Sequence, residues 1–542
     1  MEPMTPLKAT PWRWTRAAGL VGLAALAGAA VYGGFLRGRD APPPPPPARP
    51  AAAAEDIARE VNGFCNSSCH APALPEAFPR RYWRSEVERG FRRFEKSTLA
   101  LTPPPLEDVI RYFEERAPEE LPPADLPPPP SRPLGLRFEK VSYPGPPARE
   151  RFAISNVNLV RLPAGGASGG RQPPVSRGAS TGDSAGPRDI LACDMLNGLV
   201  MLLRPYEPSP AWKVIAQVPH PAHTEVVDLD RDGLLDVLVA DLGSFPPTDR
   251  LCGRVVWLRG RPDGSFTPVT LLENVGRVVD VQAADFRGTG RLDLIVAEFG
   301  WQDAGKVVLL ENETTDWDKP KFVPRVVDSR HGAIHVPVCD LNGDGRPDFV
   351  TVFAQEHETV VAFLNDGGGK FTPRELYRGP HPGYGSSGIE LVDLNRDGRL
   401  DVLYTNGDIL DEPHIFKPYH NVQWLENKGD LRFEHHLITP LYGAHRAVAA
   451  DFRGQGLPDV VAVSFMPQDK FPDRAARRPD AVVFLEQVAP GKFERHTLES
   501  TTCDHTTCAV GDVFGTGEAA IVVGQFSSMN TDHPVTIYRR VK

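Results

Sequence analysis

Apolar and polar residues alternate in short runs along most of the chain, and this period of two predicts β-strands. Each repeat starts with an alternating run such as TEVVDLD, crosses an Asp- and Gly-rich loop, and continues in a β-branched run such as DVLVADLG. A third apolar run (RVVWLRG, KVVLLEN) and a fourth that begins at an aromatic residue (FTPVTLL, FVPRVVD) complete the unit. Four strands per unit is the content of one blade of a β-propeller.

The Asp-rich loops recur at intervals of 53–61 residues, which indicates a repeat architecture. Their sequences are DLDRDGLLD, DFRGTGRLD, DLNGDGRPD, DLNRDGRLD, DFRGQGLPD and DVFGTGEAA, beginning at Asp228, Asp285, Asp340, Asp393, Asp451 and Asp512.

The two ends of the array give the blade count. Residues 186–205 match the second and third strands of a further unit, whose loop is replaced by the low-complexity stretch AGGASGGRQPPVSRGASTGDSAGP. The last unit ends at VTIYRRVK without a fourth strand, whereas LRFEKVSYP (Leu136–Pro144) has the form of that strand and precedes the first unit. An N-terminal strand that completes the last blade closes the ring and removes an exposed sheet edge. The sequence therefore predicts an all-β fold, a seven-bladed β-propeller over residues 134–542.

Composition adds that the chain is globular and that nucleic acid is not its partner. Of its 542 residues, 41% are hydrophobic and 24% are charged, which is long and apolar enough for a large core. The net charge of −10 gives no electrostatic footprint for a polyanion.

The N-terminus predicts export. Residues 17–36 are uncharged and mostly apolar, long enough to cross a bilayer, so residues 1–16 are a predicted cytoplasmic tail and 17–36 a single-pass transmembrane anchor. A cleaved secretory signal is the alternative, since AGA at Ala27–Ala29 offers small residues for cleavage. Both place the bulk of the chain outside the cytoplasm, in the periplasm or the extracellular space. Residues 37–54, with six consecutive prolines, are a predicted stiff polyproline II linker.

The Asp-rich loops are candidate calcium sites. Positions 1, 3, 5 and 9 of DLNGDGRPD carry side-chain oxygens, the hard ligands that suit Ca²⁺. An EF-hand is excluded because position 12 is Val239, Thr351 or Tyr404 rather than Glu, and because the flanks are predicted strands.

The units resemble FG-GAP repeats, also called VCBS repeats, of the integrin α-chain type of seven-bladed propeller. The resemblance implies structural Ca²⁺ in the hairpin between the first two strands of a blade; an unfilled Asp-rich turn is the alternative. The other loops carry Arg287, Arg453 or Phe514 at position 3, so we expect them to be metal-free, with Arg287 bridging Asp285 and Asp293 in place of the ion. The implied ligands are Asp228, Asp230, Asp232 and Asp236; Asp340, Asn342, Asp344 and Asp348; and Asp393, Asn395, Asp397 and Asp401.

Residues 55–123 predict a small α-helical domain, with helices in EDIAREVNG, PRRYWRSEVERGFRRF and PLEDVIRYFEERAP. Its FCNSSCHAP stretch resembles a cytochrome c domain, which implies haem c attached to Cys65 and Cys69 with His70 on the iron. The spacing is one residue longer than the usual C-x-x-C-H, and no Met or second His follows before the propeller. A disulfide between Cys65 and Cys69 is the alternative in an oxidising compartment.

The first strand of each unit has one polar phase, and first strands line the central channel of a propeller. This phase predicts either an axial-channel ligand or metal site or the wetted wall of a water-filled channel. The residues concerned are His223, Asp280, His335 and Arg446, together with Glu225 and Glu390.

Two classes of function follow. The first is a membrane-anchored, extracytoplasmic, calcium-binding propeller that acts as an adhesion-like binding or scaffold module for a protein or glycan ligand. The alternative is a c-type haem redox protein with a propeller domain. The sequence favours binding over catalysis because it contains no H-E-x-x-H metal motif.

Overall fold

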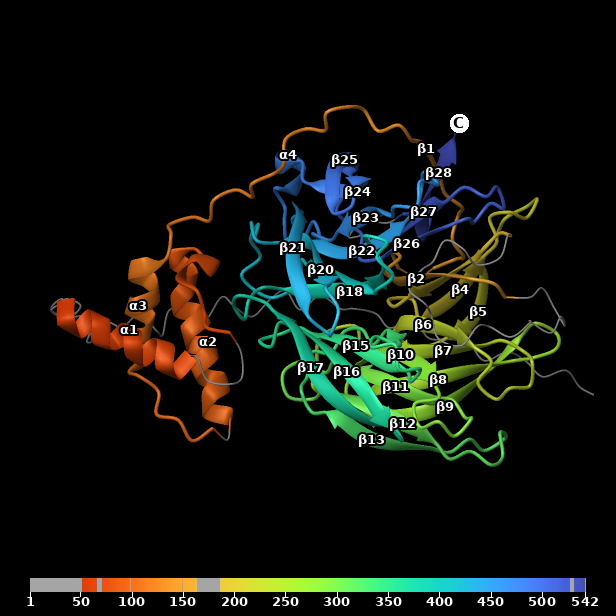
Figure 1. Ribbon diagram of the computed structural model, residues 1–542, viewed down its shortest axis with the longest axis horizontal. Helices are drawn as coiled ribbons and strands as arrows, with labels where there is room; N and C mark the ends of the chain where they lie inside the picture. Colours follow the sequence, from red (N-terminus) through yellow and green to blue (C-terminus); the bar gives the residue numbers. More distant parts are fainter. Residues whose placement is uncertain are drawn as a thin grey trace, which may run out of the picture. The chain divides into compact units, whose positions relative to one another are not determined.

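The computed structural model describes residues 51–65, 71–97, 99–148, 150–162, 186–526 and 531–541. One compact unit spans Ile57–Lys542 and contains the propeller, which is drawn in Figure 1. Among the described residues no helix is both long and apolar enough to cross a membrane. The predicted anchor over residues 17–36, Cys69 and His70 lie outside the described residues, as does the side chain of Cys65.

The segment before the propeller is helical, as predicted. It contains α1 (Ala51–Cys65), α2 (Trp83–Lys96) and α3 (Leu106–Arg116), with single 3-10 turns η2 (Pro75–Ala77) and η3 (Arg80–Tyr82). Trp83 of α2 stacks on Phe113 of α3 with ring centroids 4.1 Å apart, and the two rings lie in a cluster of buried apolar side chains. The amphipathic faces of the sequence thus pack on one another.

Seven antiparallel sheets of four strands form the propeller, which confirms the predicted fold class (Figure 1). The first three blades are β2 (Ile154–Val160), β3 (Asp189–Asp194), β4 (Leu199–Leu203) and β5 (Lys213–Gln217); β6 (Pro221–Val227), β7 (Asp236–Asp241), β8 (Gly253–Gly260) and β9 (Phe266–Val275); and β10 (Val278–Ala284), β11 (Asp293–Glu298), β12 (Lys306–Asn312) and β13 (Phe322–Asp328).

The next three blades have the same strand order. They are β14 (Val338–Cys339), β15 (Asp348–Phe353), β16 (Thr359–Gly367) and β17 (Lys370–Arg378); β18 (Ser386–Val392), β19 (Asp401–Asn406), β20 (Asn421–Asn427) and β21 (Phe433–Pro440); and β22 (Ala444–Ala450), β23 (Asp459–Ser464), β24 (Asp480–Ala489) and β25 (Lys492–Ser500), with the short helix α4 (Arg474–Arg477) before β24.

The seventh blade joins the two ends of the propeller. Its strands are β26 (Cys508–Gly511), β27 (Ala520–Gly524), β28 (Val535–Val541) and, from the N-terminal side, β1 (Arg137–Val141). β1 pairs antiparallel with β28, from Arg137 opposite Val541 to Val141 opposite Ile537. The strand predicted at Leu136–Pro144 therefore closes the ring, and β3 and β4 confirm the first blade.

The core lies between neighbouring blades. The second strands are buried at every position, as in DVLVAD of β7, because both of their faces meet another blade. Leu238 and Trp257 of the second blade, for example, pack with Val281 and Leu294 of the third. The five cysteines outside the helical segment, Cys193, Cys252, Cys339, Cys503 and Cys508, are unpaired, and all except the half-buried Cys252 are buried.

Candidate functional site

The last Asp of each predicted calcium loop, at position 9, is buried and connects the loop to the third strand of its blade through hydrogen bonds. Asp348 accepts the Leu341 amide of its own loop (3.0 Å) on one oxygen and the Asn365 amide at the end of the third strand (2.7 Å) on the other. Asp236 and Asp401 make the same pair of bonds in their blades. Burial raises the pKa of Asp236 to about 7 and that of Asp401 to about 6. These carboxylates are costly to ionise unless a cation lies nearby.

The first Asp shapes the loop backbone in the same way whether or not the other ligands are present. The carboxylate of Asp340 accepts the amides of Asp344 (3.0 Å) and Gly345 (2.9 Å). Asp285, in a loop without the ligand set, accepts the amides at the corresponding positions, from Thr289 and Gly290. The backbone conformation therefore does not distinguish the two kinds of loop, whereas the side chains at positions 3 and 5 do.

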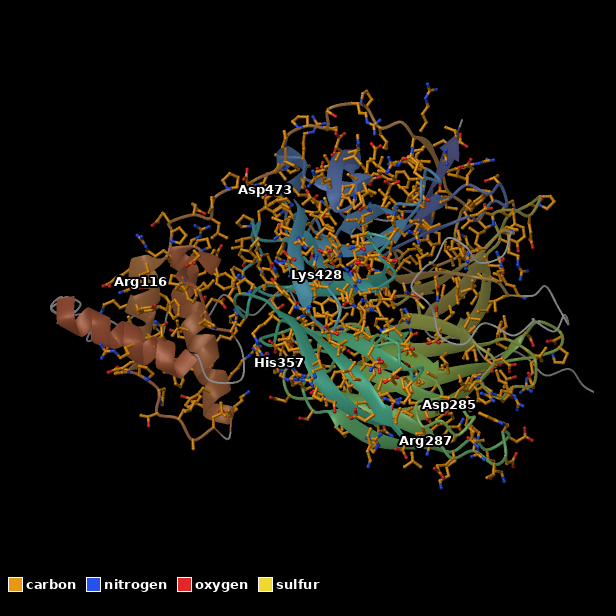
Figure 2. All side chains as sticks on the ribbon, viewed as in Figure 1. Arg116, Asp285, Arg287, His357, Lys428 and Asp473 are labelled. Carbon is orange, nitrogen blue, oxygen red and sulfur yellow. The ribbon has the colours of Figure 1, made fainter. Side chains whose placement is uncertain are left out.

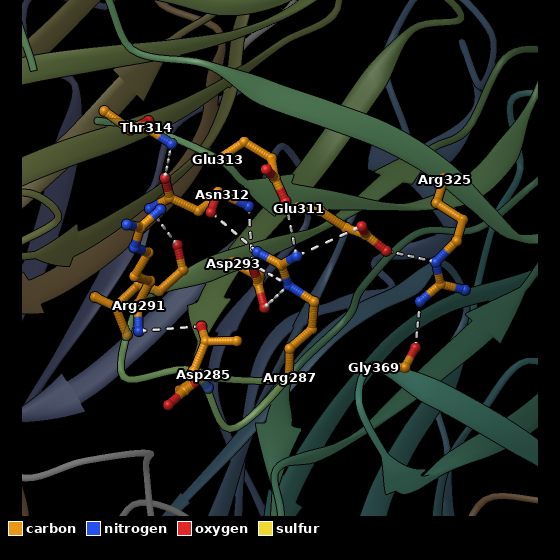
Figure 3. Close-up of polar contacts among 12 residues, drawn as sticks. Asp285, Arg287, Arg291, Asp293, Glu311, Asn312, Glu313, Thr314, Arg325 and Gly369 are labelled. Atoms are coloured by element: carbon orange, nitrogen blue, oxygen red, sulfur yellow. Dashed lines mark hydrogen bonds and ion pairs between the residues drawn. The ribbon is translucent and has the colours of Figure 1, made fainter. Parts of the chain in front are cut away.

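In the third blade a guanidinium lies where the ligand set is missing, as Figure 3 shows. Arg287 Nε is 3.0 and 3.2 Å from the two carboxylate oxygens of Asp293, which is fully buried. The same side chain donates to the Asn312 carbonyl (2.9 Å) and to Glu313 (3.2 Å). The expectation that Arg287 also reaches Asp285 is wrong, since the guanidinium is directed at Asp293 and the third strand, and Asp285 accepts the loop amides instead.

Three further blades also lack the ligand set, and in each the buried Asp at the start of the second strand either pairs with an arginine or is absent. In the sixth, Arg453 Nη2 lies 2.8 Å from Asp459, again buried at position 9. In the first, Asp189 begins the second strand and pairs with Arg204 Nε at 3.3 Å. In the seventh, position 9 is Ala520, and no cation is needed there. Only the second, fourth and fifth blades have the position-9 Asp and an Asp or Asn at position 3.

The loop of the second blade best matches an ion site among the described loops. Asp228, Asp230 and Asp236 each offer one oxygen within 4.8 Å of the others. Asp228 Oδ1 is buried and has no hydrogen-bond partner among the described residues, while Asp230 pairs with Arg259 Nη2 at 2.7 Å. Asp232 accepts the Leu234 amide (2.8 Å). An orphaned carboxylate oxygen among converging oxygens fits Ca²⁺.

In the fourth and fifth blades the donor set fits Ca²⁺ by its chemistry, but position 5 also pairs with an arginine. Asp344 accepts Asn342 Nδ2 (2.9 Å) and Arg346 Nη2 (2.5 Å) on one oxygen. Asp397 is held in the same way by Asn395 and Arg399. Of the three predicted ligand sets, only that of the second blade brings three carboxylate oxygens within 4.8 Å of one another among the described residues.

The axial residues come together in part. His223 Nδ1 is 2.8 Å from one oxygen of Asp280, and His335 Nδ1 is 3.8 Å from the other, so three adjacent blades meet at one carboxylate. Burial would raise the pKa of Asp280, but the two imidazoles outweigh it and hold the pKa well below its ordinary value. Burial lowers the pKa of His335 to about 4. With Nδ1 directed at the carboxylate, Nε2 is the nitrogen left to each ring for a ligand.

A second axial pair comes from the fifth and sixth blades. Arg446 Nη2 is 3.6 Å from Glu390 and its Nη1 donates to the Ile389 carbonyl (2.6 Å). Glu225, from the second blade, accepts the Ala283 amide (3.2 Å), and burial together with the charge of Asp280 raises its pKa well above the ordinary value. The six predicted residues therefore supply both donors and acceptors along the axis.

A buried carboxyl outside the predicted sites is Glu358, between β15 and β16. It is 3% exposed and accepts the Ser386 amide (2.8 Å) and hydroxyl (2.5 Å). Burial raises its pKa to about 8, so the folded protein holds it protonated at neutral pH.

Sequence reasoning missed two identical side-chain triads on the outer strands of the fifth and sixth blades. The signal that identifies them is the spacing E-x7-E-x-H, which occurs in LENKGDLRFEHH and again in LEQVAPGKFERH. They are Glu426, Glu434 and His436, and Glu486, Glu494 and His496.

Comparison with known proteins agrees with the class of repeat. The FG-GAP-like repeat family matches residues 217–296 and 340–404, which include the loops of the second to fifth blades. The chain thus carries FG-GAP-like repeats on a seven-bladed propeller, a fold that fits a binding or scaffold module. No curated protein matches the chain.

Proposed function

We propose that the protein is a membrane-anchored, extracytoplasmic binding module whose propeller is stiffened by Ca²⁺ in the loops of the second, fourth and fifth blades. Asp228, Asp340 and Asp393 begin these loops. When bound, the ion supplies positive charge and cross-links positions 1, 3, 5 and 9 of one hairpin. All side-chain ligands come from one hairpin, which supports a structural role for the ion.

One observation carries the calcium proposal: every buried Asp at the start of a second strand has either an arginine or a set of oxygen ligands. Arg204, Arg287 and Arg453 serve the first, third and sixth blades. The seventh blade has Ala520 instead of the Asp and Phe514 instead of a ligand. A buried anion needs compensation, and Ca²⁺ is the cation that the remaining three loops are suited to hold.

The ligand of the module, a protein or a glycan, binds in this proposal at the axial residues. The imidazoles of His223 and His335 and the guanidinium of Arg446 are donors, and they remain about one fifth exposed, at 19%, 22% and 24% of their side chains. A closed seven-bladed ring presents them on a rigid frame, which lowers the entropy cost of binding.

Calorimetry with and without Ca²⁺ tests the proposal. The melting temperature should fall in EGTA and recover on addition of Ca²⁺, because exported modules typically bind the ion with a Kd of about 10⁻⁴ to 10⁻³ M. Asp344→Ala should lower the number of bound calcium ions by one while Asp285→Ala, in an arginine loop, leaves it unchanged. A wild-type protein without any calcium-dependent shift would refute the calcium assignment.

Binding is tested separately on a glycan array and by capture of extracellular proteins. Asp280→Asn should lose the signal that the wild type gives, because the amide no longer orients the two imidazoles. Asp263→Asn, on the exposed turn between β8 and β9, is the matched control. Equal signals from wild type and Asp280→Asn would move the ligand site away from the axis.

A further inference from the structure

The two triads occupy equivalent positions in neighbouring blades. Glu426 faces Glu434 across β20 and β21, and Glu486 faces Glu494 across β24 and β25. The histidine follows two residues later on the fourth strand, so all three side chains lie on one face of the hairpin. In each triad one ligand atom per residue lies within 4.8 Å of the others.

In the fifth blade a lysine neutralises the triad. Lys428 Nζ lies 3.0 Å from Glu426 and 3.8 Å from Glu434, and Figure 2 labels it on its blade. His436 Nε2 lies 2.9 Å from the second oxygen of Glu426. Asn395 donates to Glu426 as well (3.0 Å). Both carboxylates of this triad therefore have charged partners within the protein.

In the sixth blade the residue that corresponds to Lys428 is Val488. Glu486 is 3% and His496 is 7% exposed. The three inward atoms, Glu486 Oε2, Glu494 Oε2 and His496 Nε2, are buried and have no hydrogen-bond partner among the described residues. Glu486 Oε2 and His496 Nε2 lie 3.3 Å apart as an ion pair without hydrogen-bond geometry, and Glu494 Oε2 has no hydrogen-bond donor in the described part of the chain, so the three atoms lack a shared partner there.

The outer oxygens of the same two glutamates are fixed by donors. Glu486 Oε1 accepts from Arg453 (2.8 Å) and from Arg132 (2.7 Å), and Glu494 Oε1 accepts from Ser131 (2.7 Å). These contacts turn the second oxygen of each carboxylate towards His496. Outer contacts of this kind orient the ligands of protein metal sites.

We propose that Glu486, Glu494 and His496 bind a divalent transition-metal ion, with Zn²⁺ as the best match. Zinc lies ~2.0–2.2 Å from nitrogen and oxygen ligands, so two ligands of a tetrahedral ion are roughly 3.3 Å apart. His496 Nε2 and Glu486 Oε2 are 3.3 Å apart. The imidazole disfavours Ca²⁺, which takes oxygen ligands, and three protein ligands leave a fourth position for water or an outside ligand.

The site has a route to solvent beside it. His496 forms part of the wall of a pocket of about 610 Å³ between β25 and the proline-rich segment 126–130 that leads to β1. Arg495 and Phe138 line the same pocket. An ion in the triad would thus connect β24 to β25 in the sixth blade, next to the segment that leads to the ring-closing strand β1.

Zinc binding to the full-length protein tests the proposal, measured by competition with a chromophoric chelator in ~5 mM Ca²⁺ so that the calcium loops are filled. Glu494→Gln and Val488→Lys should each lose one zinc equivalent, or weaken it about 100-fold or more, since one removes a ligand and the other supplies the lysine of the fifth blade. Glu434→Gln, in the lysine-filled triad, should bind zinc as the wild type does.

The comparison between variants decides the result, because Cys65, Cys69 and His70 are also ligand types for zinc. Val488 is 42% exposed, so Val488→Lys is expected to fold, which circular dichroism and melting check. Tetrahedral Co²⁺ absorption that is present in the wild type and absent in Val488→Lys would support the site. Equal zinc stoichiometry and affinity in wild type, Val488→Lys and Glu494→Gln would overturn it.

Discussion

Giving the arginine loop of the third blade the ligand residues of a proposed calcium loop should make the stability of the protein depend more strongly on calcium. The double substitution Arg287→Asn and Thr289→Asp converts DFRGTGRLD of the third blade to the ligand pattern of DLNGDGRPD in the fourth. It removes the guanidinium from Asp293 and supplies oxygens at positions 3 and 5. We expect the variant to be less stable than the wild type in EGTA and to regain most of the loss in Ca²⁺.

The structure sets the size of both effects. Asp293 is fully buried and the Arg287 side chain is 15% exposed. Breaking a buried ion pair of this kind lowers the free energy of unfolding by about 3–5 kcal/mol. The Asn312 amide still binds Asp293 in the variant, which lowers the expected loss to about 2–3 kcal/mol. With a Kd of about 10⁻⁴ to 10⁻³ M, ~10 mM Ca²⁺ returns about 1.4–2.7 kcal/mol through mass action.

Differential scanning calorimetry in EGTA and in ~10 mM Ca²⁺ measures the exchange. Because the wild type has its own proposed calcium loops, the quantity compared is the extra calcium-dependent shift in melting temperature of the double variant. The single variant Thr289→Asp keeps Arg287 and should show no extra shift. If Ca²⁺ raises the melting temperature of the double variant no more than that of the wild type, then the residue at position 3 does not determine whether an arginine or an ion compensates the buried Asp.

Three further predictions address closure, a buried acid and haem. A chain that begins at Ala124 should fold, whereas one that begins after Gly145 lacks β1 and should aggregate through the edge of β28; equal solubility of the two would contradict closure. Folding must protonate Glu358 between pH 4.5 and about 8, so wild-type stability should fall by about 1.4 kcal/mol per pH unit as pH rises through that window. Glu358→Gln should gain stability over the wild type at that rate in melts from pH 6 to 8, and parallel pH profiles would rule this out. The haem hypothesis predicts a Soret band in matured protein and a covalent attachment of haem that Cys69→Ala abolishes; a Cys65–Cys69 disulfide in protein without that band would contradict it.

The fold could be predicted from the sequence because each blade repeats the same signals. The period-two runs and the recurring Asp gave the strands, and the unmatched strand at Leu136–Pro144 gave the closure seen between β1 and β28. The contact of Arg287 with Asp293 followed from the loop pattern, since a guanidinium is not a metal ligand. Its separation from Asp285 did not follow, because the loop amides that occupy Asp285 depend on the backbone conformation.

The triads on the outer strands were missed for a different physical reason. Glu486 and Glu494 are separated by seven residues in a stretch without a metal motif, and they face each other only through the register of β24 and β25. That register depends on a bulge between Gln487 and Ala489, which sequence patterns do not reveal. The spacing of a repeat therefore does not predict which side chains face each other on neighbouring strands until the strand register of one blade is known.

In the sixth blade one arginine connects the Asp-rich loop to the proposed zinc site. Arg453 pairs with Asp459 in the loop and, through Nη1, with Glu486 Oε1 in the outer hairpin of the same blade. The arginine that neutralises the buried position-9 Asp of the sixth blade is thus also a residue that binds the outer oxygen of Glu486, whose other oxygen faces His496. In the fifth blade, which has no arginine at position 3, Asn395 contacts Glu426 instead and Lys428 neutralises the triad. Between these two blades, the exchange of Asn395 for Arg453 at position 3 therefore accompanies the exchange of Lys428 for Val488 beside the triad.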